Sequence, residues 1–83
     1  MITVKYFAQL RQMAGKDEDQ FDLGAQVTLD QLSDAIGTSL PKIGELVRDK
    51  KIMVSANHDV VASDHIFKDG DEVALLPPFS GGI

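Results

Sequence analysis

The sequence predicts a small α+β domain, a mixed β-sheet with a helix packed on one face. Three observations favour this fold class. The segment "ITVKYF" follows Met1 and "EVALLPP" lies near the other end of the chain, and both alternate their side chains as strands do. Between them, "TLDQLSDAIGTSL" has the spacing of an amphipathic helix. With 83 residues, the chain has room for one domain built in two layers.

The first strand has two faces. Ile2, Val4 and Tyr6 share one of them, and Phe7 falls on the other. A side chain on the second face points away from the core of a two-layer domain. We therefore expect Phe7 to be exposed, unless it curls under the helical turn that follows.

A short helical turn and a second strand are expected next. The turn centres on Leu10 and Met13 and stops at Gly15, because glycine adopts the left-handed conformation of a helix C-cap without penalty. The segment "QFDLG" is short and alternating, which predicts a strand with Phe21 and Leu23 pointing inward.

The clearest helix spans residues 28–40. Thr28 followed three residues later by Gln31 is a capping-box pattern. Gly37 and Pro41 are expected to interrupt this helix, and "KIGELVRDKK" is expected to add one further helical turn. The stripe expected to be buried consists of Leu29, Leu32 and Ile36.

Three strands are predicted in the remainder of the chain. "IMVSA" forms the third strand and "VVA" a short fourth, and "KDGDE" predicts a tight turn before the last. In the last strand, Val73 and Leu75 share one face and Ala74 and Leu76 the other. The prolines end this strand, since proline cannot donate to a strand ladder. The order of elements is compatible with the ubiquitin-like β-grasp, although periodicity alone does not select that topology.

The composition excludes several classes of function. The 13 acidic and 8 basic residues give a net charge of −5, which disfavours nucleic-acid binding. The charge steers partners with a basic groove, or simply keeps a small domain soluble. There are no cysteines to hold a metal or form disulfides. We expect a cytoplasmic protein, because no signal peptide and no apolar run of roughly 20 residues is present.

Catalytic side chains are not indicated by any motif. The chain has no glycine-rich phosphate loop, and Ser80 lacks the G-x-S-x-G context of a nucleophile. His58 and His65 have no close histidine partner, whereas a metal site needs three or four convergent ligands. The acidic "DGDE" lacks the spacing of a calcium loop and predicts a solvated turn.

Two features point instead to a protein partner. Phe7 and Leu76 both face away from the core, and they become neighbours if the first and last strands pair, so they predict an exposed apolar patch. The second feature is the ending "LLPPFSGGI", in which Gly81 and Gly82 can pass where a side chain would clash. Residues 77–82, at about 3.3 Å each, can reach roughly 20 Å from the domain. The alternative for this segment is a frayed terminus.

These segments resemble the MoaD family, the small subunit of molybdopterin synthase. The match covers the whole chain: "VKYFAQLR" is similar to the opening strand and helix, and "VSANHDVV" to the third strand and turn. "DGDEVALLPPFSGG" is the most specific piece, because turn, strand, double proline and Gly-Gly occur in order. The double proline also makes the chain less similar to the related thiamine-pathway carriers of the ThiS type.

The resemblance implies a β-grasp domain at residues 1–76, a flexible tail at residues 77–83, and a sulfur-carrier role. An E1-like enzyme of the MoeB type uses ATP to adenylate the carboxylate of Gly82, which then becomes a thiocarboxylate. The tail inserts into the large subunit, MoaE, where the sulfur builds the dithiolene of molybdopterin, and Gly81 gives a slim approach. No cofactor binds directly and no catalytic side chain is required. The partner-binding residues implied are Phe7, Val60, Leu76, Pro77, Pro78, Phe79 and Ser80.

Ile83 departs from the family pattern, whose members end at the second glycine. Three explanations are open. A protease removes Ile83; or Ile83 is tolerated, or does not belong to the natural gene product; or the chain is a homologue that binds its partner without carrying sulfur. Two further functions stay open beside the sulfur carrier. One is a ubiquitin-like modifier that joins Gly82 to a target lysine, and the other is a binding module whose tail is only a docking arm.

Overall fold

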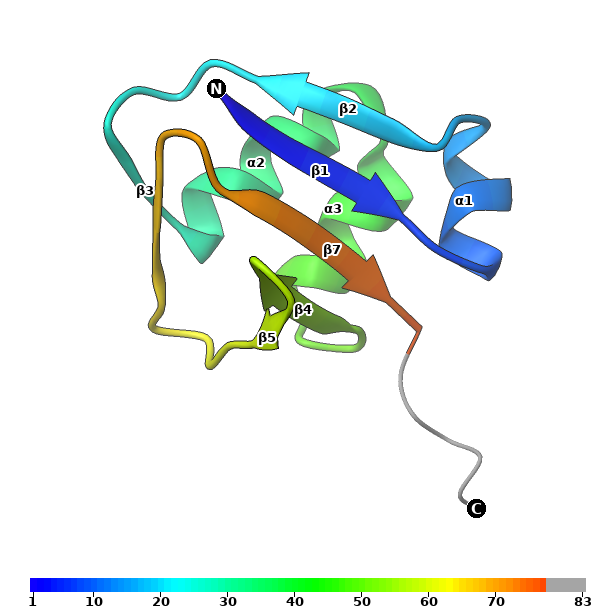
Figure 1. Cartoon of the computed structure of the whole chain (residues 1–83). Helices are drawn as coiled ribbons and strands as arrows, with labels where there is room; N and C mark the ends of the chain where they lie inside the picture. The colour runs from blue at the N-terminus through cyan, green and yellow to red at the C-terminus, as the bar shows by residue number, and fades with distance from the viewer. Residues whose placement is uncertain (78–83) are drawn as a thin grey trace.

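The computed structural model of the chain describes residues 1–77. This part forms seven strands and three helices, and residues 78–83 lie outside it (Figure 1). The strands are β1 (Ile2–Tyr6), β2 (Glu18–Phe21), β3 (Gln26–Thr28), β4 (Met53–Ala56), β5 (Asp59–Val60), β6 (Ile66–Lys68) and β7 (Glu72–Leu76). The helices are α1 (Gln9–Ala14), α2 (Leu29–Ser39) and α3 (Pro41–Arg48).

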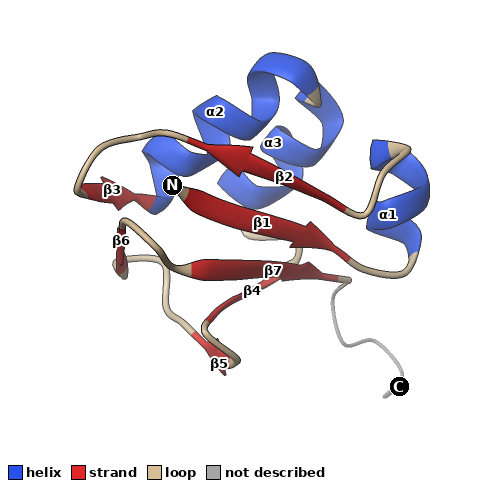
Figure 2. Ribbon diagram, turned by 45° about the horizontal axis from the view of Figure 1, so that its top comes forward, coloured by secondary structure: helices blue, strands red, loops and turns tan. Residues whose placement is uncertain are grey.

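Five strands form one mixed sheet in the order β2-β1-β7-β4-β5. β1 and β7 run parallel at its centre, and all other neighbours are antiparallel. The short strands β3 and β6 pair separately. α2 and α3 cover one face of the large sheet, and its other face is open (Figure 2). The predicted α+β architecture, with a mixed sheet and helices on one face, is confirmed.

The core lies between the large sheet and the two helices. Ile2, Val4 and Tyr6 of β1 are buried, as the alternation predicts, and so are Val73 and Leu75 of β7. Other strands and all three helices add the rest of one apolar cluster. Its further members are Leu10, Val27, Leu29, Leu32, Ile36, Ile43, Val47, Val54, Ala56 and Phe67.

The sequence locates the start of α2 correctly. The Gln31 backbone N–H donates to the Thr28 hydroxyl oxygen at 3.1 Å, and the Thr28 N–H donates to the Gln31 side-chain oxygen at 2.9 Å. This reciprocal pair is the predicted capping box. Gly37 does not interrupt the helix as expected. α2 continues to Ser39, and Pro41 then opens α3 at the first helical position, where a missing N–H costs nothing.

Several other expectations are wrong in detail. The second strand lies at Glu18–Phe21 rather than 20–24, and the fourth at Asp59–Val60 rather than 60–62. The expected single helical turn after Pro41 is an eight-residue helix, α3. β3 and β6 are absent from the prediction, because three-residue strands are too short to show a period. Gly15 caps α1 in the left-handed conformation as predicted, but Met13 is 45% exposed and only Leu10 is buried there.

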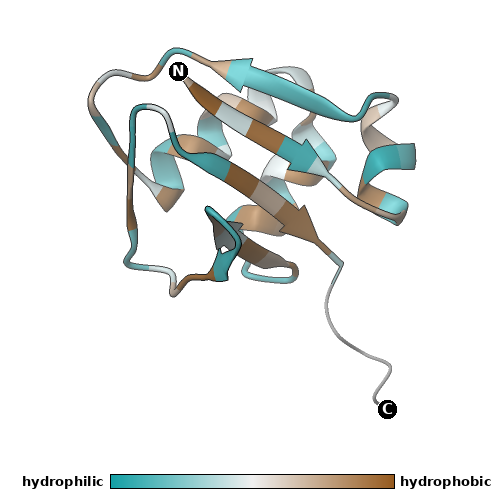
Figure 3. Cartoon of the chain, viewed as in Figure 1, coloured by the Kyte–Doolittle hydropathy of each residue, from teal (hydrophilic) through white to brown (hydrophobic). Residues whose placement is uncertain are grey.

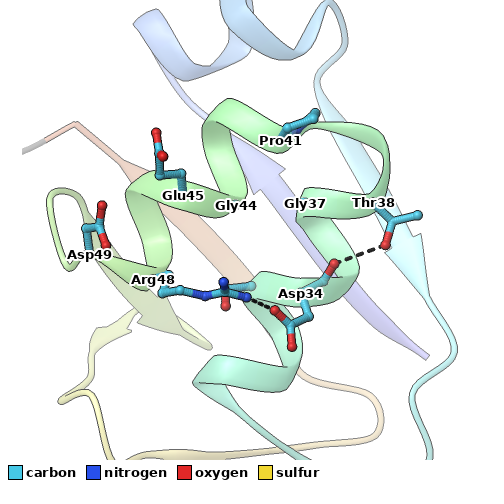
Figure 4. A pocket seen from close by; sticks show the side chains of 9 residues that line it. Asp34, Gly37, Thr38, Pro41, Gly44, Glu45, Arg48 and Asp49 are labelled. Carbon is cyan, nitrogen blue, oxygen red and sulfur yellow. Dashed lines mark hydrogen bonds and ion pairs between the residues drawn. The ribbon is translucent and has the colours of Figure 1, made fainter.

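α2 and α3 approach each other closely through two glycines. A Cβ atom built on Gly44 would lie 2.6 Å from the Gly37 Cα and 2.8 Å from the Ser33 carbonyl oxygen. Both atoms belong to the backbone and cannot rotate away. Arg48 also forms an ion pair with Asp34 across the shallow groove between the helices, which Figure 4 shows with both glycines at its base. The distance between α2 and α3 is therefore set by direct contact between their backbones at Gly37 and Gly44.

Replacing Gly44 by alanine tests this contact. Because the added Cβ would overlap backbone atoms of α2, we expect Gly44→Ala to lower the free energy of unfolding by about 1–3 kcal/mol. Gly37→Ala is the matched control, since its Cβ would meet only the Gly44 Cα at an ordinary 3.7 Å. That change should be neutral, or stabilising by up to about 1 kcal/mol through helix propensity. Urea unfolding of both variants measures the difference, and equal stabilities would show that the glycines do not set the helix spacing.

Candidate partner-binding surface

The open face of the sheet carries apolar side chains near the end of β7. Val73 and Leu75 point to the core, so Ala74 and Leu76 project from the open face. Leu76 is half-buried and pairs in register with Met53 of β4. Figure 3 shows β7 turning from hydrophilic to hydrophobic toward this end. The last residues of β7 therefore present an apolar surface that no helix within residues 1–77 covers.

Phe7 lies beside Leu76 because β1 and β7 are parallel neighbours. Tyr6 pairs with Leu75, which places the next residue of each chain segment side by side. The Phe7 N–H donates to the Leu75 carbonyl oxygen at 3.3 Å, and the Phe7 carbonyl oxygen accepts from the Leu10 N–H at 3.0 Å. Both backbone groups are thus satisfied while the side chain stays 42% exposed.

The turn after Phe7 has an unusual conformation. Ala8 has φ 52° and ψ −125°, a left-handed region that favours glycine. This residue turns the chain sharply from β1 into α1 and ends the strand at Tyr6. Phe7 is exposed at the end of β1 as predicted, so the alternative, in which it is buried beneath α1, is wrong.

Val60 extends the apolar surface across β4. It pairs with Ser55, which in turn pairs with Ala74, so all three lie on the open face. With 63% of its surface exposed, Val60 is the most exposed large apolar residue among residues 1–77. We define the open-face patch as Phe7, Met53, Val60, Ala74 and Leu76.

Polar residues border the patch toward the start of β1 and β7. The Lys5 Nζ lies 3.6 Å from the Glu72 carboxylate, and each side chain is 38% exposed. An exposed pair of this kind adds little stability. It marks the boundary beyond which the open face becomes polar, with Thr3 of β1 and Gln20 of β2 paired in register.

The tail residues expected to bind a partner begin where the patch ends. Pro77 is half-buried and directly follows β7. The others lie outside the described residues, so the structure does not place them. They are Pro78, Phe79, Ser80, Gly81 and Gly82.

Residues 1–77 contain no group of three or more His, Asp or Glu side chains that could hold a metal ion. His58 lies in the turn between β4 and β5, and the ring of His65 packs edge-on against Phe67 with centroids 4.8 Å apart. None of the helices within this range is long and apolar enough to cross a membrane.

The acidic turn before β7 has a structural role. The Lys68 N–H donates to the Asp71 carboxylate at 2.9 Å and the Asn57 side-chain amide donates to it at 3.0 Å. The hydrogen bond from the Lys68 backbone is the main cause that holds the pKa of Asp71 below its ordinary value. Burial opposes it, and the Asn57 hydrogen bond and the charges of His65 and Lys68 add to the lowering. Asp71 thereby ties the turn before β7 to the turn between β4 and β5.

Comparison with known proteins agrees with this fold. The ThiS family model matches residues 4–82. The molybdopterin synthase sulfur carrier subunit of Escherichia coli (strain K12) is 33% identical over 82 residues, which cover 99% of this chain and 100% of that protein. The structure of the putative molybdopterin converting factor, subunit 1, from Pyrococcus furiosus has a TM-score of 0.76 at 32% identity, over 93% of this chain and 95% of that one. SAMP1, small archaeal modifier protein 1 of Haloferax volcanii, also has a TM-score of 0.76, at 30% identity over 98% of both chains.

The fold and these similarities define a ubiquitin-like β-grasp protein. The chain belongs to the ThiS family, and its resemblance to the MoaD-type sulfur carrier subunits extends over its whole length. The predicted β-grasp fold and the predicted family resemblance are both confirmed.

One member of the open-face patch was missed in the sequence. Met53 opens β4 and pairs with Leu76 at the end of β7. The alternation of "IMVSA" could have placed it opposite the buried Val54. The strand order was needed to show that it touches the end of β7.

Tyr6 is anchored just below the patch. Its hydroxyl donates to the Asp19 carboxylate at 2.9 Å, which links β1 to β2, and the Lys16 ammonium donates to the same carboxylate at 2.9 Å. Burial first, and then the hydrogen bond and charge of Asp19, raise the pKa of the Tyr6 phenol well above its ordinary value. This anchor fixes the end of β1 from which Phe7 projects.

Titration of Tyr6 tests the anchor, because it is the only tyrosine in the chain. In the folded protein, the absorbance of tyrosinate should appear only well above pH 10. In denaturant, Tyr6 should titrate with the ordinary tyrosine pKa of about 10. The folded protein holds the Tyr6 proton more tightly than the unfolded chain does. The resulting contribution to the free energy of unfolding is fully present below about pH 10, the pKa in the unfolded chain, and is lost as the pH rises through the higher pKa of the folded protein. Asp19→Asn should lower the pKa only in part, since burial remains, and Asp22→Asn serves as the control. An ordinary titration in the folded protein would contradict the anchor.

Proposed function

We propose that this chain is a sulfur-carrier subunit of molybdopterin synthase. The carboxylate of Gly82 attacks the α-phosphate of ATP on an E1-like enzyme and releases pyrophosphate, which gives an acyl-adenylate. A donor of sulfur at the oxidation level of sulfide then displaces AMP to give a thiocarboxylate. The large subunit receives the tail, and the thiocarboxylate sulfur is transferred to a cyclic pyranopterin to build the dithiolene of molybdopterin. Inside that complex the attack becomes effectively intramolecular, so no acid or base of this chain is required.

One observation carries the proposal: the open-face patch lies where the chain leaves β7 toward Gly81 and Gly82. A protein that binds the open-face patch is therefore positioned next to the start of the tail. Residues 77–82 can extend roughly 20 Å, enough to carry a reactive carboxyl group into a neighbouring active site. The whole-chain similarity to a sulfur carrier subunit supports the same function.

The proposal also names partners and a compartment. The patch serves the large MoaE-type subunit and a MoeB-type adenylating enzyme, both of which must reach the same tail. The net charge of −5 favours partners whose approach surface is basic. The reaction uses ATP and reduced sulfur, which fits a cytoplasmic protein. Chemistry at Gly82 requires its carboxylate to be free, so Ile83 must be removed first.

The mass of the intact protein from its own cells tests the carrier function. We expect a chain that has lost Ile83, together with a form heavier by the difference between one sulfur and one oxygen atom. Purified protein that ends at Gly82 should gain the same mass when incubated with its activating enzyme, ATP and a sulfur donor. Gly82→Ala in that protein is the control and should form little thiocarboxylate. If Ile83 is retained and no sulfur is added in cells, the chain does not carry sulfur.

Charge substitutions in the open-face patch test the partner surface. Phe7→Asp and Leu76→Asp place a charge in an apolar interface, and each should weaken binding to the large subunit by tenfold or more, about 1.4 kcal/mol. Gln20→Asp makes the same change of charge on the polar part of this sheet face and should bind normally. Calorimetric titration measures the affinities, after thermal unfolding has shown that each variant folds. Wild-type affinity in both patch variants would contradict the assignment of this surface.

A second function, a ubiquitin-like protein modifier, is favoured by the similarity to SAMP1 of Haloferax volcanii. In that case Gly82 is joined to lysine side chains of other proteins. Isopeptide adducts on cellular proteins distinguish this function from sulfur transfer. The two functions share the adenylation step, so both lose activity when Gly82 is deleted.

A further inference from the structure

An apolar depression, separate from the groove between α2 and α3, lies at the edge of the sheet beside β5. We call it the β5 groove. It has a volume of about 320 Å³ and separates the loop after α3 from the segment after β5. Leu29, Val47 and Val54 are buried members of its lining, whereas Ile52 and Val61 are half-buried. The groove therefore offers an apolar interior that is open to solvent.

The groove exists because β5 is very short. β5 pairs only with Ser55 and Ala56, which leaves the first half of β4 without a strand neighbour on this side. The Val61 N–H donates to the Val54 carbonyl oxygen at 3.0 Å, and the chain then turns away toward β6. A gap in the sheet edge remains, and part of the core between α2, α3 and β4 reaches the surface through it.

The β5 groove is continuous with the open-face patch. Met53 and Val60 belong to the patch and also line the groove. An interface that covers the patch as far as Val60 therefore reaches the mouth of the groove. Apolar anchors seated in pockets at the centre of an interface supply most of the binding energy of protein complexes.

The mouth of the β5 groove is positively charged, whereas the chain as a whole has a net charge of −5. Lys50 lines it, and Lys51 follows directly as the only adjacent lysine pair of an acidic chain. Among residues 1–77, neither lysine has a carboxylate within 4.0 Å. Asp49 precedes Lys50 in the sequence but lines the groove between α2 and α3 instead of the β5 groove. A carboxylate on the partner would therefore find an available cation here.

We propose that the β5 groove receives an anchor from the large subunit, an apolar side chain followed by an acidic residue. This inference rests on the proposed function, because it assigns a second contact to the same partner. The open-face patch and the tail supply one part of the interface, and the groove supplies a pocket around the edge of the sheet. The apolar side chain fills the space between Ile52 and Val61, and the carboxylate pairs with Lys50.

The test uses the full-length protein and its purified large subunit. Ser63 is exposed and lines the groove, so Ser63→Phe should occupy the space without disturbing the core. We expect it to weaken binding about tenfold or more. Its control is Ser39→Phe, on an exposed serine that ends α2 and lines neither groove.

Charge reversal tests the acidic partner residue separately. Lys50→Glu should weaken binding roughly two- to fivefold at low salt and less at high salt, as an exposed ion pair requires. Lys42→Glu makes the same change on the exposed first turn of α3 and should have no effect. Thermal unfolding verifies that each variant folds.

The outcomes separate this inference from the proposed function. If the wild-type protein does not bind the large subunit, the proposed function is wrong, and the groove loses its partner with it. If the wild-type protein binds and Leu76→Asp does not, but Ser63→Phe and Lys50→Glu bind like wild type, only the groove proposal is overturned. If the protein alone self-associates in sedimentation and Ser63→Phe abolishes this, a second copy occupies the groove, which also overturns the proposal.

Discussion

The parallel pairing of β1 with β7 is the constraint on which the rest of the structure depends. Parallel neighbours end at the same edge of a sheet, so the strand that opens the chain and the strand that closes it finish side by side. This brings Phe7 next to Leu76, although 68 residues separate them in the sequence. A sheet with the same strands in antiparallel order would put Phe7 at the opposite end from the tail. The location of the open-face patch is therefore a consequence of topology as much as of residue type.

The two faces of the large sheet differ in what covers them. One face is covered by α2 and α3, which approach each other closely at Gly37 and Gly44. The other face has no covering layer among residues 1–77, and its apolar side chains gather near β7. Leaving this surface uncovered forgoes some apolar burial, as expected of a surface kept for binding. One face of the sheet therefore contributes to the core, and the other carries the surface that we propose for binding.

Sequence patterns predicted those parts of the fold that repeat over several residues or follow from one strong local signal. The alternation of Ile2, Val4 and Tyr6 identified β1, and the pair of Thr28 and Gln31 located the start of α2. The patterns failed where an element is too short to show a period, as in β3 and β6, or where tertiary packing overrides a local signal. Gly37 was expected to interrupt α2, yet it remains helical because Gly44 of α3 packs against it.

The candidate site shows the same division. Exposure of Phe7 follows from the alternation of side chains in β1, whereas a binding role for the tail is only what the resemblance to a family implies. Met53 joins the patch only through its register with Leu76, and register is set by which strands pair. The β5 groove could not be predicted at all, since it arises from the two-residue length of β5 and the ends of two helices. A cavity between distant elements leaves no pattern in the sequence that lines it.

The attachment of Met1 has a practical consequence for handling the protein. Its ammonium group forms an ion pair with Asp69, and its carbonyl oxygen accepts from the Gly70 N–H at 2.9 Å, so the start of β1 is tied to the turn before β7. This turn lies at the opposite end of the two central strands from Phe7 and Leu76. Five residues of β1 separate the ends by about 17 Å. An affinity label or fluorophore joined before Met1 would replace the ammonium group by an amide and remove the ion pair with Asp69, but it would keep the bond from the Gly70 N–H. It would lie at the end of the central strands opposite Phe7 and Leu76 and leave the open-face patch accessible.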